Sequence, residues 1–371
     1  MSISNDLIKF NDIGLVDIPL LKDFQDALTD IVTKSDYVLG EQCLQFEQEL
    51  KFSEDSKFAV GVNSGTSALI IALKALGVGP GDHVITSNLT FAATCFAILE
   101  VGAVPILVDI NPETLIMDVK LLEKSLTKDT KAIILVTLHG RVDQVDQLYD
   151  FCKLNKLKLL IDGAQSQLVK FHNQSLVNFC DLLTLSFYPG KNLGSLGEGG
   201  AILGNDEELY ETIKLFRNWG MKEKYVAKTW GGNYRMENLQ AAFLRIKLRK
   251  LPELTIFRKN KAKYYFENLP QGILLKQPVD VDSHVYHIFS IKVKNRNELI
   301  ERFKLSNIEY GIHYPVPINQ QPYYTDKCVS DGNLVISESI CQEILSIPFH
   351  PFISQLEMDR VVKVINEIGH D

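Results

Sequence analysis

Residues 83–108, HVITSNLTFAATCFAILEVGAVPILV, decide the fold class because they contain a strand, a helix and a second strand in succession. His83–Ser87 and Val104–Val108 are short, unalternating strand patterns, and Phe91–Val101 between them has the apolar content of a buried helix. Unalternating strands separated by helices are typical of a parallel sheet that is covered on both faces. This stretch therefore predicts an α/β fold.

The alternation of short strands and helices continues on both sides of this stretch. We expect further strands at 132–138, 158–161, 182–186 and 200–203, and helices at 20–33, 46–52, 68–76, 119–126 and 145–154. After residue 205 the character changes, and we expect helices at 207–218, 237–251, 296–303 and 355–368 and a strand at 285–293. The chain length suits two domains. We predict a large domain over residues 1–250 and a small C-terminal α+β domain over residues 251–371.

The composition is that of a globular protein. Hydrophobic residues make up 46% and charged residues 23% of the 371 residues, and the formal net charge is -7. A nucleic-acid-binding protein normally carries a basic patch, so we expect no nucleic-acid partner. The sequence contains no apolar run of membrane-spanning length, and its N-terminus has neither the basic nor the apolar region of a signal peptide.

The cysteines indicate a reducing environment. They are scattered and form no C-x-x-C pair: Cys43, Cys95, Cys152, Cys180, Cys328 and Cys341. Scattered cysteines of this kind are typical of reduced thiols. We therefore expect a cytoplasmic protein without a metal site.

The segment DLLTLSFYPGKNLGSLGEGGAI, residues 181–202, presents a lysine in a setting that suits covalent catalysis. A predicted strand ends at Ser186, and a turn containing Pro189 and Gly190 then presents Lys191. A lysine so placed can act as an amine nucleophile and form an imine with an aldehyde cofactor. On its own, however, a lysine in a glycine-rich loop is more often a solvated surface residue.

Two other motifs supply what pyridoxal phosphate (PLP) requires, namely a phosphate cradle and a carboxylate for its pyridinium nitrogen. NSGTSAL, residues 63–69, is a turn of small residues leading into a helix, whose first N–H groups suit a phosphate. LLIDGAQS, residues 159–166, ends a buried strand with Asp162 at the edge where α/β folds bind ligands. In isolation, each motif is equally consistent with a helix cap or a turn. The glycine-rich runs GVGPGD and GSLGEGG do not fit the dinucleotide fingerprint, so a nucleotide cofactor has little support.

In combination, these motifs are typical of one family. The sequence resembles the DegT/DnrJ/EryC1/StrS sugar aminotransferases, a branch of the type I PLP-dependent, aspartate aminotransferase-like fold. The resemblance runs nearly end to end, through NSGTSAL, TFAAT, LHG, DGAQS, SFYPGKNLGSLGEGG, GGNYRMENLQAA, GIHYPVP and LSIPFHP in the family's order. It implies a mostly parallel central sheet flanked by helices, with PLP as the cofactor.

The resemblance also implies roles for individual residues. Lys191 would hold PLP covalently and carry the proton in transamination. Asp162 would pair with the pyridinium nitrogen, and Gln165 would lie beside the ring hydroxyl. The remaining implied cofactor contacts are the stacking Phe91 and the phosphate ligands Gly65, Thr66, Ser186 and Asn233. Asn233 resembles the family asparagine that reaches the phosphate from the neighbouring subunit, which implies a homodimer with shared active sites.

On the substrate side, the resemblance implies transfer from L-glutamate to a keto sugar linked to a nucleoside diphosphate. Tyr188, His313 and Tyr314 are the implied sugar contacts. GIHYPVP is most similar to members that act on 3-keto sugars, such as dTDP-3-keto-6-deoxyhexoses. A 4-keto sugar, a UDP-linked 3-keto uronic acid, an aminocyclitol precursor and a non-catalytic regulatory protein of the same fold remain alternatives. Lys191 argues against the family's dehydratases, in which a histidine replaces this lysine.

Three positions depart from the family pattern. Gln167-Leu168-Val169 stands in place of a small "HGA"-like run, and we expect it to alter a wall of the cofactor pocket. Asn319 stands where members with HYPxP often continue with a histidine, so a histidine role in sugar recognition is not carried over. Arg141 follows His139-Gly140 where a small or amide residue is more usual, and the sequence gives no physical account of it.

Overall fold

The computed structural model describes residues 6–278, 280–330 and 332–368. Residues 1–5 of the N-terminal segment and 369–371 of the predicted small domain lie outside the described residues. The strands of the main sheet are β1 (Phe58–Val62), β2 (His83–Ser87), β3 (Val104–Val108), β4 (Thr130–Val136), β5 (Lys158–Asp162), β8 (Leu182–Ser186), β9 (Gly200–Gly204) and β13 (Val329–Ser330).

The main sheet has eight strands in the order β1-β9-β8-β5-β4-β2-β3-β13. β9 runs antiparallel to β1 and β8, whereas the pairs from β8 to β13 are parallel. The predicted α/β class with a mostly parallel sheet is therefore confirmed. β1 is a strand that the sequence analysis did not predict, because its short run FAVGV is interrupted by a glycine, which weakens a strand pattern.

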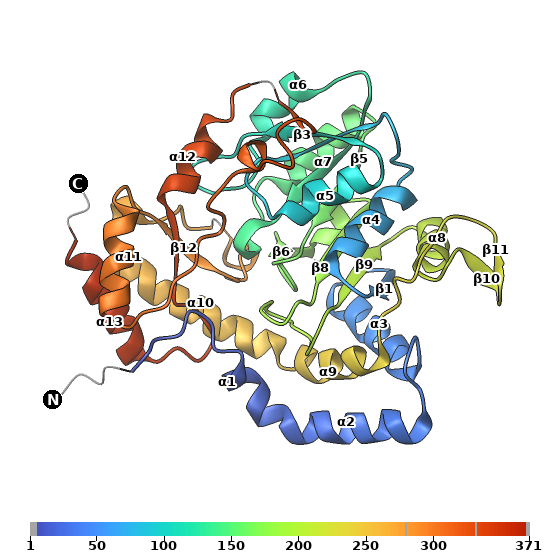
Figure 1. Ribbon diagram of the computed structural model, residues 1–371, viewed down its shortest axis with the longest axis horizontal. Helices are drawn as coiled ribbons and strands as arrows, with labels where there is room; N and C mark the ends of the chain where they lie inside the picture. Colours follow the sequence, from blue (N-terminus) through green and yellow to red (C-terminus); the bar gives the residue numbers. More distant parts are fainter. Residues whose placement is uncertain (1–5, 279, 331, 369–371) are drawn as a thin grey trace.

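Helices cover both faces of this sheet (Figure 1). One face packs against α3 (Glu41–Ser53), α7 (Val145–Leu154) and α9 (Asn238–Leu248). The other face packs against α4 (Gly65–Ala75), α5 (Ala92–Glu100) and α8 (Glu207–Arg217). The sheet is thus the middle layer of three, which explains why its strands are apolar on both faces.

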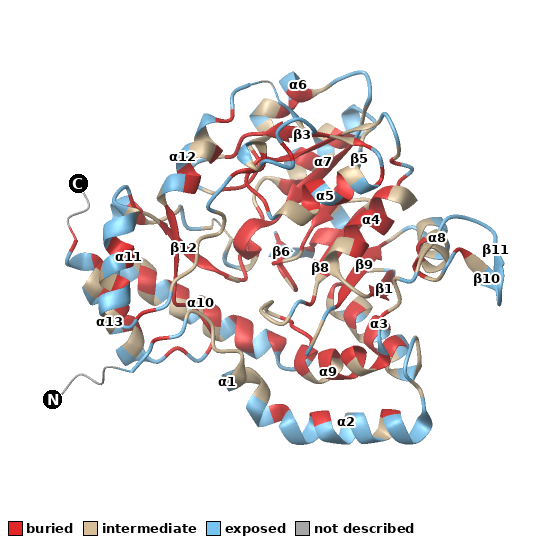
Figure 2. Cartoon of the chain, in the orientation of Figure 1, coloured by how far each residue is buried: buried red, intermediate tan, exposed pale blue. Residues whose placement is uncertain are grey.

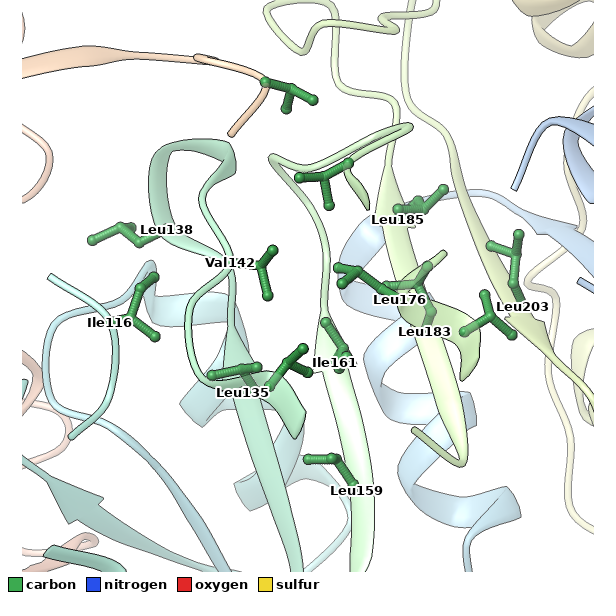
Figure 3. Packing of buried hydrophobic residues seen from close by; sticks show 14 of the residues in the cluster. Ile116, Leu135, Leu138, Val142, Leu159, Ile161, Leu176, Leu183, Leu185 and Leu203 are labelled. Atoms are coloured by element: carbon green, nitrogen blue, oxygen red, sulfur yellow. The ribbon is translucent and has the colours of Figure 1, made fainter. Parts of the chain in front are cut away.

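The side chains of each strand alternate between the two faces. Leu159 and Ile161 of β5 belong to one buried cluster, and Leu160 between them belongs to the other. Figure 3 shows the first cluster, where Leu159, Ile161 and Leu135 lie together with Leu183 of the neighbouring strand. Burying each such side chain contributes roughly 1.5–3 kcal/mol, so these layers fix the strand register.

A second, smaller core lies at the C-terminal side. It is built on α10 (Leu251–Asn268), α11 (Arg296–Leu305), α13 (Gln355–Asn366) and the antiparallel pair β12 (Phe289–Lys292) and β14 (Ile344–Ile347). Ile8 of the N-terminal segment joins this core and pairs with Ile308. This separate core supports our division of the chain near residue 250, which stays a proposal.

The C-terminal helices differ from the prediction in two places. The predicted helix 237–251 ends at Leu248, and α10 follows it as a separate long helix that was not predicted. The apolar residues of α10 are spread around the helix rather than along one stripe, so its periodicity is weak. α12 (Val335–Glu343) was also missed, and the predicted strand 285–293 is shortened to β12.

Two elements stand apart from the cores (Figure 1). α2 (Leu21–Lys34) runs along the outside of the molecule, and Figure 2 shows most of its length exposed. The hairpin of β10 (Met221–Glu223) and β11 (Val226–Ala227) projects from the side of the large domain. In the part of the chain that the structure describes, no helix is both long and apolar enough to cross a membrane.

Candidate active site

A cavity of about 660 Å³ opens at the carboxyl ends of the parallel strands. β5 ends there with Asp162, β8 ends there with Ser186, and Phe91 follows β2 at the same edge. Parallel strands carry their carboxyl ends to one edge, which is where open α/β sheets bind ligands. Ten of the eleven predicted site residues line the cavity: Gly65, Thr66, Phe91, Asp162, Gln165, Ser186, Tyr188, Lys191, His313 and Tyr314.

Lys191 lies in the turn that follows β8. Its backbone N–H donates to the Tyr188 carbonyl over 2.8 Å, which closes the turn and presents the side chain to the cavity. Burial lowers the pKa of the Lys191 amine to about 8, while the nearby Asp162 carboxylate opposes this shift. A substantial fraction of the amine is therefore neutral near physiological pH, and the neutral amine is the nucleophilic form.

Asp162 presents a carboxylate that is positioned from two sides. The Thr94 hydroxyl donates to Oδ2 over 2.8 Å, and the Ala164 N–H donates to Oδ1 over 3.2 Å. Burial raises the pKa of Asp162, while these two hydrogen bonds and Lys191 counteract the rise. A buried carboxylate is stabilised by a cationic partner. The protonated pyridinium nitrogen of PLP would be such a partner, so this residue fits the cofactor.

The N-terminus of α4 forms a tight anion cradle. Ser64 caps the helix by accepting from the Ser67 N–H, while Gly65 and Thr66 occupy the first turn and line the cavity. The first N–H groups of a helix have no intrahelical partner and attract anions. A Cβ on Gly65 would lie 2.7 Å from Cβ of Ser186, so only glycine allows this approach. The cradle therefore suits a phosphate.

Gln165 connects the cofactor side of the cavity to the substrate side. Its Oε1 accepts from the His139 N–H over 2.5 Å, and its Nε2 donates to the Tyr314 hydroxyl over 3.3 Å. The Phe91 ring lies 5.8 Å from the Tyr314 ring and is 59% exposed, so its face is available to a planar ligand.

His313 is held by contacts on two sides. Its Nδ1 lies 2.9 Å from the Ser346 hydroxyl, and its ring stacks on Phe10 with centroids 5.6 Å apart. Burial and the Lys191 charge lower the pKa of His313 to about 4, so the imidazole is neutral at physiological pH. A neutral imidazole can donate or accept a hydrogen bond, which suits contact with a sugar hydroxyl.

Asn233 is the one predicted site residue outside this cavity. It is exposed, and its carbonyl accepts from the Asn63 amide over 3.3 Å. A residue that is predicted to act in a neighbouring subunit is expected to be exposed in its own chain. The contact of Asn233 with a phosphate therefore stays a prediction.

Several cavity residues were missed by the sequence analysis. The most informative are Phe10, Asn11, Thr94, Glu198 and His287. Thr94 lies one helical turn after Phe91 in the motif TFAAT, so helical spacing could have indicated it. Phe10 and Asn11 reach the cavity from the far N-terminus, and no local pattern indicated which segment would cover it.

Two departures from the family pattern lie behind the cavity wall rather than in it. Among the described residues, those that line the cavity do not include Gln167 or Asn319. The Gln167 amide donates to the Ser186 carbonyl over 2.7 Å, so it contacts the wall from behind, and the expected effect of this run on the wall stays a prediction. Asn319 is tied to Asn88 and Glu338 by hydrogen bonds, which accounts for it structurally.

Arg141 now has a physical account. Its guanidinium is buried, donates to the Lys276 carbonyl, and forms an ion pair with Asp143 at 2.8 Å. Lys276 belongs to the C-terminal part of the chain, whereas Arg141 follows β4. Arg141 therefore joins two segments that are distant in the sequence.

A lysine and a carboxylate facing one cavity beside a helix N-terminus define the class, a type I PLP-dependent aminotransferase. The chain belongs to the DegT/DnrJ/EryC1/StrS aminotransferase family, whose model matches residues 20–366. A curated relative is the dTDP-3-amino-3,4,6-trideoxy-alpha-D-glucose transaminase of Streptomyces venezuelae, 34% identical over 92% of this chain and 90% of the relative.

Solved structures show the same similarity. S. venezuelae DesV in complex with a ketimine intermediate has a TM-score of 0.94 at 32% identity, covering 97% of this chain and 98% of DesV. NtdA from Bacillus subtilis with bound cofactor PMP has a TM-score of 0.87 at 31% identity, covering 94% of this chain and 81% of NtdA. The predicted fold, family and aminotransferase activity are confirmed, and PLP is supported as the cofactor.

Proposed function

We propose that this enzyme uses PLP to move an amino group from L-glutamate to C3 of a dTDP-linked 3-keto-6-deoxyhexose. The observation that carries the proposal is the Lys191 amine, with its lowered pKa, in the same cavity as the Asp162 carboxylate and the α4 cradle. The choice of sugar is supported by the relative from S. venezuelae, whose name specifies a 3-amino dTDP sugar.

Each part of the cavity would have a separate task. The Gly65 and Thr66 N–H groups and the Ser186 hydroxyl would hold the phosphate, and Phe91 would cover one face of the ring. Asp162 would keep the pyridinium nitrogen protonated. Bound PLP would supply an electron sink for the charge that develops when a proton leaves the carbon next to nitrogen.

Lys191 would act as the base and the acid of both half-reactions. Its amine would take the α-proton of glutamate and return it on the other side of the nitrogen, then run the reverse sequence with the keto sugar. His313 and Tyr314 would orient the sugar, with Tyr188 at the mouth of the cavity. Because one cavity serves both substrates in turn, ping-pong kinetics are expected.

The proposal extends to the assembly and location of the protein. We propose a homodimer in which Asn233 reaches the phosphate in the partner's cavity, and a cytoplasmic location in keeping with the scattered thiols. The hydroxyl and imidazole groups of Tyr188, Tyr314 and His313 would also suit a 4-keto sugar or a UDP-linked acceptor, and a substrate panel distinguishes these cases.

Lys191→Ala tests the central residue. The variant should lose transamination entirely while it keeps the melting temperature and assembly of the parent, because Lys191 lies in the turn after β8 and belongs to none of the hydrophobic cores. Lys128→Ala, a change at an exposed lysine far from the cavity, serves as the matched control and should keep full activity. Glutamate-dependent turnover by the purified Lys191→Ala protein would contradict the assignment.

A substrate panel tests the choice of sugar. The parent enzyme is offered glutamate with dTDP-, UDP- and GDP-linked 3-keto and 4-keto sugars, and the product is identified by mass spectrometry and NMR. We expect amination at C3 of a dTDP sugar. Amination at C4 alone would overturn the regiochemistry, and absence of any amination with all acceptors would overturn the substrate class.

A further inference from the structure

Two cysteines meet in a small core beside the active site. Cys95 lies on α5, and Cys328 lies in the surface segment 321–328 that leads to β13. Both belong to the core formed around Leu107, Ile318 and Tyr324. The two thiols lie close enough for each to shift the pKa of the other. They are more than 200 residues apart in sequence, so only the tertiary fold brings them together.

The two thiols differ in exposure and acidity. Cys95 is completely buried, whereas Cys328 is half-buried in a segment whose neighbours Lys327 and Val329 are exposed. Interaction with the Cys95 thiol and the charge of Lys327 lower the pKa of Cys328, whereas interaction with the Cys328 thiol and burial raise the pKa of Cys95. An accessible thiol of lowered pKa next to a buried second thiol is the arrangement of an attacking and a resolving cysteine.

The other cysteines lack this arrangement. Cys43, Cys152 and Cys341 are buried, and the pKa of Cys180 is raised by burial and Asp181. Within the described residues, no second thiol influences the pKa of any of these four groups. Cys95 and Cys328 are therefore the pair to consider for thiol chemistry.

The position of Cys95 connects this pair to the catalytic cavity. Cys95 directly follows Thr94, whose hydroxyl donates to Asp162, and Phe91 begins the same helix. The segment that carries Cys328 is already attached to this helix, because the Tyr324 hydroxyl donates to the Ala92 carbonyl over 3.2 Å. A covalent link between the two cysteines would thus act on the helix that holds Asp162 in place.

We propose that Cys95 and Cys328 form a reversible disulfide that makes the enzyme responsive to low-molecular-weight disulfides. The Cys328 thiolate attacks one sulfur of the small disulfide and releases one small thiolate. The Cys95 thiol then loses its proton and attacks the Cys328 sulfur, which releases the second small thiolate and forms the Cys95–Cys328 bond. The small disulfide is reduced to two thiols, and the two protein thiols are oxidised.

The bond should disturb the cavity rather than leave it unchanged. A disulfide holds its sulfurs about 2.05 Å apart, closer than any two thiols that are not bonded to each other. α5 and the segment 321–328 must approach each other, and any shift of Cys95 displaces the adjacent Thr94. Because a misplacement of about 1 Å near a reacting group can reduce the rate by a factor on the order of a hundred, we expect activity to fall at least about tenfold on oxidation.

Oxidised glutathione is the probe that tests the proposal. The PLP-loaded enzyme is incubated with it, digested without reduction, and mapped by mass spectrometry alongside activity measurements. We expect a cross-linked peptide pair containing Cys95 and Cys328, a mass lower by two hydrogens, loss of activity, and recovery of both properties with dithiothreitol. The mass measurement is independent of turnover, so failure of the proposed substrate would not affect it.

Single substitutions assign the roles of the two thiols. Cys328→Ser should remain fully active after oxidation and form no adduct in this region. Cys95→Ser should retain glutathione as a stable mixed disulfide on Cys328, since the resolving thiol is gone. Cys180→Ser is the matched control, and it should cross-link and lose activity like the parent. Absence of the cross-link in the parent, or loss of activity by Cys328→Ser on oxidation, would overturn the proposal.

Discussion

At the scale of single residues, the cavity is organised around the opposing effects of burial on Lys191 and Asp162. Burial lowers the pKa of the amine and raises the pKa of the carboxyl, so it disfavours the charged form of both groups. Two hydrogen bonds hold Asp162 toward its ionised form, and the Thr94 hydroxyl supplies the shorter of them. A cationic ligand ring would complete this balance, which is why an aromatic pyridinium suits the site.

Asp162→Asn should retain PLP but reduce kcat/KM at least about a hundredfold, the scale expected when one preorganised charge is removed from a site.

Thr94→Val should have a smaller effect, about tenfold, because it removes one hydrogen bond to a charged group. That hydrogen bond lowers the pKa of Asp162, so its loss should also move the acidic limit of activity to higher pH. An unchanged pH profile in Thr94→Val would contradict the role given to this contact.

Glu54 offers a pH test that does not involve catalysis. This buried carboxyl accepts the Leu168 N–H over 2.8 Å, and burial raises its pKa to about 7. In the unfolded chain this carboxyl has a pKa near 4.5. The folded state therefore holds the proton more tightly, and the free energy of unfolding falls as the pH rises from about 4.5 to about 7. Glu54→Gln removes this effect and should be more stable than the parent above pH 7, by roughly 1–3 kcal/mol.

The difference between Glu54→Gln and the parent should shrink as the pH falls below about 7 and disappear below the unfolded pKa. Urea unfolding at several pH values measures it. Glu253→Gln, the same change at an exposed carboxyl, is the matched control. A constant offset between Glu54→Gln and the parent at all pH values would show that this carboxyl is not the titrating group.

The sequence predicted those site residues that follow a strand or begin a helix. Asp162, Ser186 and Gly65 stand at such positions. The carboxyl ends of parallel strands meet at one edge of the sheet, so their meeting does not depend on long-range contacts elsewhere in the chain. Phe10 could not be predicted in the same way. It reaches the cavity because Ile8 pairs with Ile308 and because Glu309 accepts the Phe10 N–H, and both are long-range contacts.

At the scale of elements, a backbone ladder joins the large sheet to the C-terminal part of the chain. Val142 donates to Ser283 and Val285 donates to Gly140, each over 2.9 Å. The buried Arg141 reinforces this ladder through its contacts with Lys276 and Asp143. His139 in the same loop donates to Gln165, so the position of the C-terminal part of the chain is connected to the cavity wall.

Arg141→Met should lower the free energy of unfolding by about 2–3 kcal/mol, because it leaves the Lys276 carbonyl and the Asp143 carboxylate without their partner. Arg249→Met removes an exposed ion pair with Glu49 and should cost less than about 1 kcal/mol. Urea unfolding of both variants measures the contrast. Equal losses would show that the buried guanidinium does not hold the two segments together.

Element types were predictable wherever one periodicity dominated. β2, β3 and α7 coincide with their predicted ranges, since each is a short run with a clear pattern. α10 was missed because its buried stripe includes the polar Thr255 and Arg258 whereas the apolar Ile256 is exposed, so hydrophobicity does not follow burial along this helix. Distant segments determine which face of a helix is buried, so the local sequence alone does not predict it.

At the scale of the whole molecule, the exposed elements indicate where a second copy would bind. Leu28 and Val32 on α2 and Tyr225 on the projecting hairpin are exposed apolar residues in one chain. Asn233 follows that hairpin and lies outside its own cavity. A symmetric dimer would bury matching surfaces twice and place each Asn233 at equivalent positions. This supports the proposed sharing of active sites between subunits.

Subunit complementation tests that arrangement. Lys191→Ala and Asn233→Ala should each be inactive, or nearly so, as homodimers. Mixed dimers isolated after co-expression should show about half of the parent's activity, because each of them has one of its two sites complete. In the complete site, Lys191 comes from the Asn233→Ala chain and Asn233 comes from the Lys191→Ala chain. Steady-state rates of the co-purified dimers, separated by two affinity tags, measure the recovery.

The control for this experiment follows from the geometry of one chain. Lys191 and Asp162 line the same cavity of the same chain, so every dimer mixed from Lys191→Ala and Asp162→Asn has one defect in each site. This pair should therefore show no recovery. If the Asn233→Ala pair also fails to recover, although its homodimer is inactive, then Asn233 acts within its own subunit and the shared site is refuted. Recovery by the first pair alone requires that the complete site be built from two chains.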